Sequence, residues 1–283
     1  MLPHESTSLV DASVAHDHER LRGFIEAHPR LFVLTGAGCS TDSGIPDYRD
    51  TQGGWKRPQP VTYQAFMGDV CTRQRYWARS LVGWRRFGSA QPNATHRALA
   101  RLEQQGRAHV LLTQNVDGLH QAAGHRNVID LHGRLNEVRC TACGHRLPRH
   151  AFQHALIERN PAWALLDAGD APDGDADLDG RDFSGFEIPP CPACDGILKP
   201  DVVFFGENVP RDRVDAAITS LNDADGVLVV GSSLMVFSGY RFVAAAARDG
   251  KPIAAVNLGR TRADPLLTLK IEQSCAAALA FIA

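Results

Sequence analysis

The chain has 283 residues, of which 44% are hydrophobic, and its 30 basic and 32 acidic side chains give a formal net charge of −2. This size and composition suit one large α/β domain with a small satellite, and the charge balance gives no reason to expect a nucleic-acid partner. Seven cysteines are too few for a disulfide-rich scaffold of this length, and no run of about 18 apolar residues occurs. We therefore expect a cytoplasmic protein with no membrane partner.

The predicted elements alternate between helix and buried strand. After a polar lead-in at 1–18, residues 18–27 have a helical pattern, and residues 30–35 form an apolar run typical of a parallel strand. Similar apolar runs occupy 109–113, 128–131, 226–230 and 252–256, and helical patterns occupy 94–105 and 211–221. The alternation predicts a doubly wound, Rossmann-like parallel sheet.

Small or polar residues follow every predicted strand of this sheet. They occupy 36–40, 114–117, 132–133, 231–233 and 257–259. Turns after strands are often polar for no functional reason, but in an open parallel sheet the ligand lies outside the carboxyl ends of the strands. Together these turns predict one ligand crevice.

Residues 134–206 interrupt the alternation, so we expect a small module there, between the parts 19–133 and 207–283 of the large domain. Within this module the stretch 167–182 is rich in aspartate and glycine. It lacks the bidentate glutamate of an EF-hand calcium loop, and we interpret it as a solvated, partly disordered loop.

Two Cys-x-x-Cys pairs lie in the predicted module, Cys140 with Cys143 and Cys191 with Cys194. Each such turn presents two thiolates to one zinc ion, and two turns complete a tetrahedral site with no open position. The pattern predicts one structural zinc. A pair of redox dithiols is the alternative.

Gly36 and Gly38 directly follow the first strand, where backbone N–H groups can face a phosphate. The third glycine of the dinucleotide fingerprint is missing, because Thr41 stands there, and no strand-terminal acid follows about 20 residues later. These absences argue against a hydride-transferring dehydrogenase. The segment 43–54, punctuated by glycines and Pro46, indicates a loop that closes over a ligand.

His132 ends a strand and precedes Gly133 at the predicted crevice. A lone histidine is more often structural, but this one shares its edge of the sheet with the other polar strand ends. A histidine there can act as a general base near neutral pH. We therefore place His132 among the catalytic candidates.

These motifs, in this order, resemble those of the sirtuin family from about residue 20 to the C-terminus. The matching segments are Gly36–Ser40, Gly44–Arg49, Thr113–His120, His132–Gly133, the two cysteine pairs, Lys199–Glu207 and Gly231–Ser233. Residues 73–79, with Gly83 and Trp84, and residues 231–240 resemble the class II subgroup, which includes the sirtuin-4 type and bacterial relatives.

The resemblance implies a Rossmann-like domain, a zinc-binding module and NAD consumed as a co-substrate. In the family an acyl-lysine carbonyl oxygen attacks C1′ of the nicotinamide ribose, nicotinamide leaves, and the acyl group ends on ADP-ribose. His132 matches the general base, and Asn115 and Asp117 match residues that hold the ribose and the carboxamide. Other positions that the resemblance implies at the NAD site are Gly36, Ala37, Gly38, Ser40, Ile45, Pro46, Asp47, Tyr48 (usually Phe), Arg49, Gln114, Gly231, Ser232, Ser233, Asn257, Leu258, Gly259 and Cys275.

For the substrate, the family pattern implies an acyl-lysine peptide or protein that adds a strand between two segments. These segments contribute Val203, Phe204, Gly206, Val236, Phe237 and Ser238. Tyr76 and Arg79 resemble a pair that binds acyl carboxylates in desuccinylating sirtuins, since a guanidinium meets a carboxylate bidentately. We expect a preference for acyl groups longer than acetyl, particularly succinyl-like ones, and a monomeric enzyme.

Other functions remain open on the sequence alone. A mono-ADP-ribosyltransferase uses the same NAD pocket. A non-catalytic ADP-ribose-binding adaptor predicts loss of the base, yet His132, Asn115 and Asp117 are present. A zinc-ribbon nucleic-acid binder is disfavoured because the acidic stretch 167–182 repels phosphates.

Overall fold

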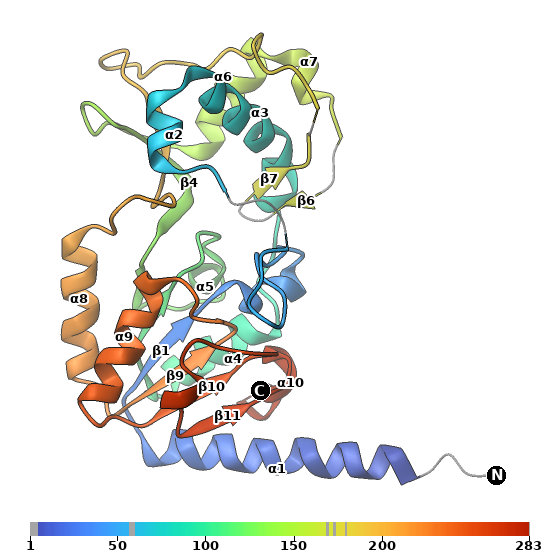
Figure 1. Ribbon diagram of the computed structural model, residues 1–283, viewed down its shortest axis with the longest axis vertical. Helices are drawn as coiled ribbons and strands as arrows, with labels where there is room; N and C mark the ends of the chain where they lie inside the picture. Colours follow the sequence, from blue (N-terminus) through green and yellow to red (C-terminus); the bar gives the residue numbers. More distant parts are fainter. Residues whose placement is uncertain (1–4, 57–59, 168–169, 172–173, 179, 283) are drawn as a thin grey trace.

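The computed structural model of the chain describes residues 5–56, 60–167, 170–171, 174–178 and 180–282. A large unit surrounds a six-stranded parallel sheet, and a small unit above it contains a three-stranded antiparallel sheet (Figure 1). This arrangement confirms the predicted fold class.

The large sheet has the strand order β11-β10-β9-β1-β2-β3. Its strands are β1 (Leu31–Thr35), β2 (Ala108–Thr113), β3 (Val128–Asp130), β9 (Gly226–Val230), β10 (Ile253–Val256) and β11 (Leu269–Ile271). Each predicted strand is present, with its bounds shifted by no more than one residue. The prediction missed β11, which is too short to show a pattern of its own.

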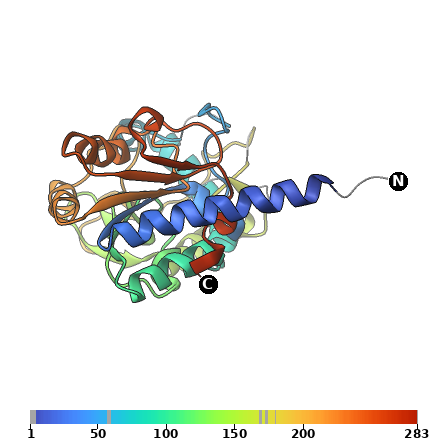
Figure 2. The same ribbon diagram turned by 90° about the horizontal axis from the view of Figure 1, so that it is seen from below.

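Alternate residues of β1 enter two separate cores, because successive side chains of a strand point to opposite faces. Leu31 and Val33 pack with helices α1 (Glu5–Ala27), α4 (Ala94–Gln104) and α10 (Cys275–Ala278). Phe32 and Leu34 pack with α8 (Arg211–Asn222) and α9 (Phe237–Arg248). Figure 2 shows these helix layers on either side of the sheet.

The first helix is longer than predicted. Residues from Glu5 onward belong to α1, whereas we expected a lead-in without regular structure up to residue 18. No glycine or proline lies between Glu5 and Arg22, so nothing interrupts the helix there.

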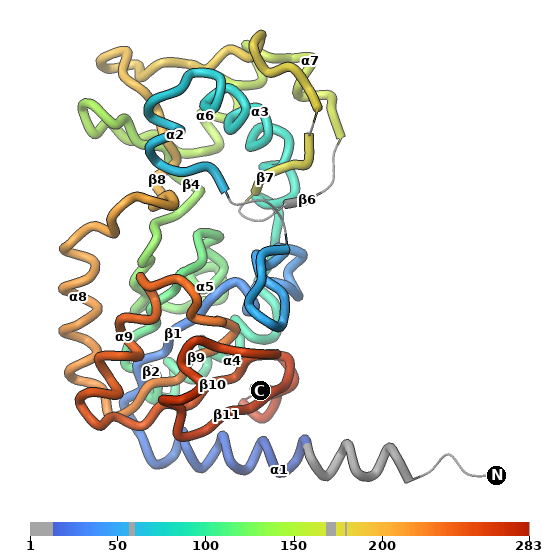
Figure 3. The backbone as a smooth tube through the Cα atoms, in the orientation of Figure 1, coloured from blue at the N-terminus to red at the C-terminus, as the bar shows by residue number. Residues whose placement is uncertain are grey.

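The small unit joins β4 (Gly133–Cys140), β5 (Arg146–Pro148) and β8 (Leu198–Val202) in the order β5-β4-β8. Figure 3 shows β4 and β8 beside each other where this unit meets the large one. Its helices are α2 (Tyr63–Gly68), α3 (Val70–Phe87), α6 (Arg149–Arg159) and α7 (Pro161–Ala164). Trp77 and Leu81 of α3 share a buried core with Val138 and Leu198. Helices α2 and α3, which precede the predicted module 134–206 in the chain, thus contribute to the core of the small unit.

Part of the acidic stretch packs against the protein and is not a solvated loop. Strands β6 (Asp170–Ala171) and β7 (Asp175–Ala176) pair as a hairpin, and Ala176 and Leu178 are buried. A Cβ on Gly83 of α3 would lie 2.3 Å from the carbonyl oxygen of Gly174, so α3 and the hairpin touch through backbone atoms. The sequence analysis missed this contact because the two buried residues, Ala176 and Leu178, alternate with aspartates and form no apolar run. Residues 168–169, 172–173 and 179 of this stretch lie outside the described residues.

The carboxyl ends of the large sheet meet in register. Thr35 of β1 pairs with Thr113 of β2 and with Val230 of β9, and Val230 pairs with Val256 of β10. β2, the next strand of this sheet along the chain, lies on one side of β1, and β9 lies on the other side of β1. Such a switch point opens a crevice at the carboxyl edge.

Candidate functional site

A cavity of about 690 Å³ lies between the two units. Its walls include most of the residues predicted for the site. They are Gly36, Ala37, Gly38, Asp47, Tyr48, Arg49, Tyr76, Gln114, Asn115, His132, Val203, Phe204, Gly206, Gly231, Ser232, Ser233, Val236, Phe237, Ser238, Asn257, Leu258 and Cys275. Both the sheet edge and the small unit therefore contribute to one site.

A few predicted residues lie behind this wall. Ser40 and Asp117 are a layer back, where the Ser40 hydroxyl donates to Asp117 Oδ2 at 2.7 Å. Ile45 and Pro46 line a separate small recess. Gly259, at a φ of 84°, packs against the backbone of Thr51.

The backbone N–H groups of two glycines after β1 bond to the end of β9 and to the loop after it. The N–H of Gly36 donates to Val230 O at 3.2 Å, and the N–H of Gly38 donates to Gly231 O at 2.9 Å. A Cβ on Gly38 would lie 2.9 Å from Gly231 O, so only glycine permits this approach. The loop after β1 is thus locked to the loop after β9, and these two N–H groups are not available to a phosphate.

Contacts with the Trp55 ring order the segment after this loop. Arg49 lies with its guanidinium carbon 4.0 Å from the Trp55 ring centroid and donates to Gly53 O at 2.7 Å. Trp55 in turn contacts Phe205 edge-on, with centroids 5.6 Å apart. The predicted closing loop is therefore tied to the small unit through Trp55, a cavity residue that the sequence analysis did not single out.

His132 is held at the sheet edge by both ring nitrogens. Nδ1 lies 2.9 Å from Gln114 O, and Nε2 lies 2.8 Å from Ser238 Oγ. A carbonyl oxygen only accepts, so Nδ1 carries the proton, and the lone pair on Nε2 accepts from the Ser238 hydroxyl. Burial lowers the pKa of His132 to about 4, with the charges of Arg213 and Arg241 acting in the same direction and the hydrogen bond to Gln114 acting against them. The imidazole is neutral near pH 7 and can accept a proton through Nε2.

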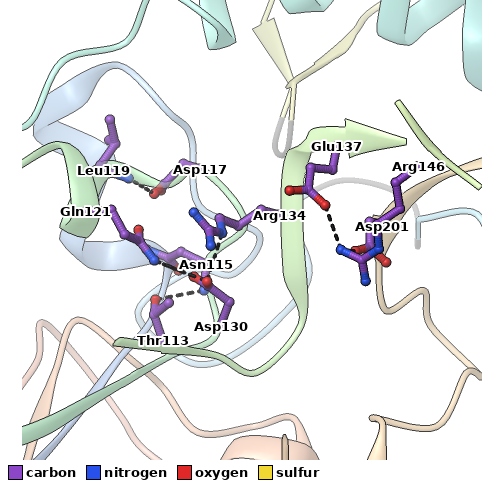
Figure 4. Close-up of polar contacts among 10 residues, drawn as sticks. All are labelled: Thr113, Asn115, Asp117, Leu119, Gln121, Asp130, Arg134, Glu137, Arg146 and Asp201. Atoms are coloured by element: carbon purple, nitrogen blue, oxygen red, sulfur yellow. Dashed lines mark hydrogen bonds and ion pairs between the residues drawn. The ribbon is translucent and has the colours of Figure 1, made fainter. Parts of the chain in front are cut away.

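Asn115 connects Gly36, at the start of the loop after β1, to Ser40. Its amide nitrogen donates to Gly36 O and to Ser40 Oγ, each at 3.1 Å, while its backbone N–H donates to Thr113 Oγ1 (Figure 4). Burial raises the pKa of Asp117, although bonds from the Leu119 N–H and Ser40 lower it. These bonds fix the positions of two predicted catalytic residues.

A second carboxylate lies near this network. Asp130 accepts from the Gln121 amide at 2.9 Å and pairs with Arg134 Nε at 2.8 Å, on the strand that leads to His132 (Figure 4). In the same view Arg146 of β5 pairs with Glu137 of β4 and with Asp201 of β8, so the pairs join all three strands of the small sheet. These pairs anchor both chain segments that flank His132.

Three buried histidines lie behind Ser40, and the sequence analysis missed them. The ring centroids of His96 and His120 are 4.8 Å apart, and those of His120 and His125 are 5.6 Å apart. Burial lowers the pKa of His96 to about 4 and that of His120 well below its usual value. The Asn93-x-x-His96 spacing at a helix start is the signal that could have marked the first of them.

The two predicted peptide segments both reach the cavity. Residues 203–207 follow β8, and 235–238 lead into α9. Phe237 is 59% exposed and lines the cavity, so it offers apolar surface at this site. The arrangement is compatible with strand addition.

Tyr76 and Arg79 diverge in the structure. Tyr76 lines the cavity and packs on Phe204, with ring centroids 5.2 Å apart. Arg79 is absent from the cavity wall, and its Nε donates to Asp175 Oδ1 at 2.9 Å. In this structure the Arg79 guanidinium pairs with Asp175, and a role of Tyr76 and Arg79 in binding the acyl group stays a prediction.

The four predicted metal ligands form one cluster in which all sulfur atoms lie within 4.8 Å of one another. Sγ of Cys140 is 3.6 Å from that of Cys194, and Sγ of Cys143 is 3.7 Å from that of Cys191. A tetrahedral zinc with bonds of about 2.3 Å separates its sulfurs by about 3.8 Å, so the cluster fits zinc. A Cβ on Gly196 would lie 2.9 Å from Cys140 Sγ, which explains a glycine beside the cluster.

The fold and the site define a dinucleotide-binding protein with a structural zinc module. The family model described as Sir2 family matches residues 36–238, and the chain belongs to this family, whose members are called sirtuins. A protein of Xanthomonas axonopodis pv. citri named NAD-dependent protein deacetylase is 72% identical over 95% of this chain and 92% of its own length. NAD-dependent protein deacetylase 2 of Bradyrhizobium diazoefficiens is 67% identical over 94% of this chain and 97% of its own.

Solved Sir2 structures have the same fold. A complex of Sir2 with a p53 peptide and NAD+ has a TM-score of 0.72 and 29% identity, covering 93% of this chain and 95% of that one. Sir2Tm bound to a propionylated peptide also has a TM-score of 0.72, with 28% identity, over 93% of this chain and 96% of the other. The predicted family is thus confirmed, whereas the class II placement stays a prediction. In the described part of the chain, no helix is long and apolar enough to cross a membrane.

Proposed function

We propose that this protein is an NAD-dependent protein-lysine deacylase. The observation that carries the proposal is the orientation of His132, whose lone pair on Nε2 lies in a cavity shared by the sheet edge and the two peptide segments. The deacetylase names of relatives at 67–72% identity support it.

In the proposed reaction NAD is consumed as a co-substrate, and its ADP-ribose part accepts the acyl group. The ADP-ribose part of NAD is bound by the cavity residues near the sheet edge, which come from the ranges 36–49 and 231–258. Asn115 and Asp117 orient the nicotinamide end from their fixed positions. His132 takes a proton through Nε2, and its bond to Gln114 keeps the ring in the required tautomer.

The acyl-lysine peptide is proposed to lie between residues 203–207 and 235–238. The backbone of these segments supplies affinity, and the exposed Phe237 gives an apolar contact. The four cysteines hold zinc away from this reaction, where its role is to stabilise the fold.

We further propose a cytoplasmic monomer that binds neither nucleic acid nor membrane. All seven cysteines are free of disulfides, which suits a reducing compartment. Both walls of the cavity come from a single chain, so one copy is sufficient for the site.

The test is incubation with NAD and acetyl-lysine, propionyl-lysine and butyryl-lysine peptides, with products identified by mass spectrometry. We expect nicotinamide and O-acyl-ADP-ribose in equal amounts, and deacylated peptide. Transfer of ADP-ribose to a protein side chain without loss of the acyl group would instead support the ADP-ribosyltransferase. Absence of both reactions would contradict an enzymatic function.

A further inference from the structure

The small-unit side of the cavity combines an apolar wall with an acid. Val116, Leu135 and Phe204 line it, and all three belong to the buried core of the small unit. Asp175 of β7 lines the same cavity. Glu207 also reaches the cavity, but its carboxylate is paired with Lys199 at 3.0 Å.

Asp175, and not Arg79, is the member of their ion pair that faces the cavity. The Arg79 side chain is 21% exposed and the Asp175 side chain 39%. Arg79 Nε donates to Asp175 Oδ1 at 2.9 Å, and the second carboxylate oxygen adds acceptor capacity on the same side chain. Asp175 lines this cavity and also the small recess beside Ile45 and Pro46, whereas Arg79 lines neither of them.

Close packing fixes this position of Asp175. A Cβ on Gly83 would lie 2.6 Å from the carbonyl carbon of Asp175, so the absence of a side chain on α3 lets β7 approach. Gly174 has a φ of 69°, which favours glycine, and Ala176 is buried in the core. Gly174 and Ala176, the chain neighbours of Asp175, therefore hold Asp175 in this position.

The acyl tail of a substrate belongs on this wall. The acyl carbonyl has to lie near His132, and the nucleotide takes the side lined by the loops after β1 and β9. An acyl chain beyond the carbonyl then extends over the remaining apolar surface of Val116 and Leu135. The far end of the acyl chain then lies near Tyr76 and Asp175.

We infer that Asp175 makes this site select uncharged acyl groups over acyl groups that end in a carboxylate. The inference rests on the proposed deacylase function and names its substrate class. Two carboxylates in a partly desolvated cavity repel each other, and Arg79 already compensates one of them. The preference is opposite to the one expected from Tyr76 and Arg79 in the sequence.

The experiment compares butyryl and succinyl groups, which have equal chain length, on the same lysine peptide with NAD. We expect the wild-type kcat/KM for butyryl to exceed that for succinyl at least about tenfold, which corresponds to about 1.4 kcal/mol. Asp175→Asn removes the charge but keeps an oxygen that can accept from Arg79. This variant is expected to narrow the butyryl-to-succinyl ratio about tenfold.

Asp177→Asn is the matched control, because Asp177 is an exposed acid of the same segment that is absent from the cavity wall. It should leave the ratio unchanged. If the wild-type protein turns over the succinyl peptide as fast as the butyryl peptide, or faster, the inference is overturned. This outcome does not depend on whether any variant folds. A butyryl-active Asp175→Asn protein with the wild-type ratio also overturns it. No turnover of either peptide, or of an acetyl peptide, contradicts the proposed function itself.

Discussion

His132 and Ser238 are joined by a 2.8 Å contact between Nε2 and Oγ, in which the serine hydroxyl donates to the ring. The tautomer fixed by Gln114 leaves no other direction for this bond. A hydroxyl of the protein thus occupies the direction from which a ribose hydroxyl would donate its proton. The contact supports a base that is oriented before NAD binds.

Replacing His132 by alanine should lower kcat about 10²–10⁴-fold, because the proton acceptor is lost. The variant should retain its zinc and its melting temperature within a few degrees. His154→Ala provides a control, since His154 is an exposed residue of α6 away from the cavity. Steady-state rates of nicotinamide release measure both; near-normal turnover by His132→Ala would remove this residue from the mechanism.

Buried neutral histidines should make stability depend on pH between about 5 and 6.5. The folded-state pKa values of His96 and His132 are about 4, and that of His120 is also lowered, so in this window the unfolded chain binds more protons. The free energy of unfolding therefore rises with pH, by up to about 1.4 kcal/mol per pH unit for each histidine, and levels off above about 6.5. Urea unfolding at several pH values measures the slope. His96→Gln should reduce it, and a flat curve would contradict these burial effects.

Zinc should be present at about one ion per chain, and its removal should unfold the small unit. Cys140 and Cys191 are buried ligands from opposite pairs, so either change to serine should lower the melting temperature and the zinc content together. Cys71→Ser is the matched control, because Cys71 is exposed on α3 and lies outside the cluster. Elemental analysis with thermal unfolding tests this. A zinc-free protein of unchanged stability would disprove a structural metal.

The parts of this molecule that a local pattern encodes were predictable. The strand 226–230 has only apolar residues and is recovered without a shift, and the cysteine pairs form a cluster of zinc-like dimensions. Both features depend on periodicity or spacing within a few residues. The six-stranded sheet follows from repeating the same pattern.

Features that depend on contacts distant in sequence were not predictable in this way. The pairing of Arg79 with Asp175 joins residues that are 96 positions apart. The packing of α3 into the small unit rests on Trp77, whose indole nitrogen donates to Leu198 O across 121 positions. No local signal distinguishes such an arginine from a substrate ligand.

His96 is expected to act as a positioning residue for the nicotinamide end of the site. The N–H of Asn93 donates to His96 Nδ1 at 3.3 Å, so Nε2 carries the proton and points at Ser40 Oγ, 3.5 Å away. With this donor and the Asn115 amide on its oxygen, the Ser40 hydroxyl directs its own proton to Asp117. Without His96, Ser40 can turn away from the carboxylate.

His96→Leu should therefore raise the KM for NAD or lower kcat at least about tenfold, and the lost cap should cost about 1 kcal/mol of stability. Glutamine is the usual partner at this position of a capping box and has both an acceptor and a donor. His96→Gln should recover much of the rate, because it can bond both Asn93 and Ser40. A role limited to packing predicts the reverse, since leucine fills the buried site without a polar group while glutamine buries an amide. Equal kinetics for the two variants, measured at a temperature where both are folded, would contradict the positioning role.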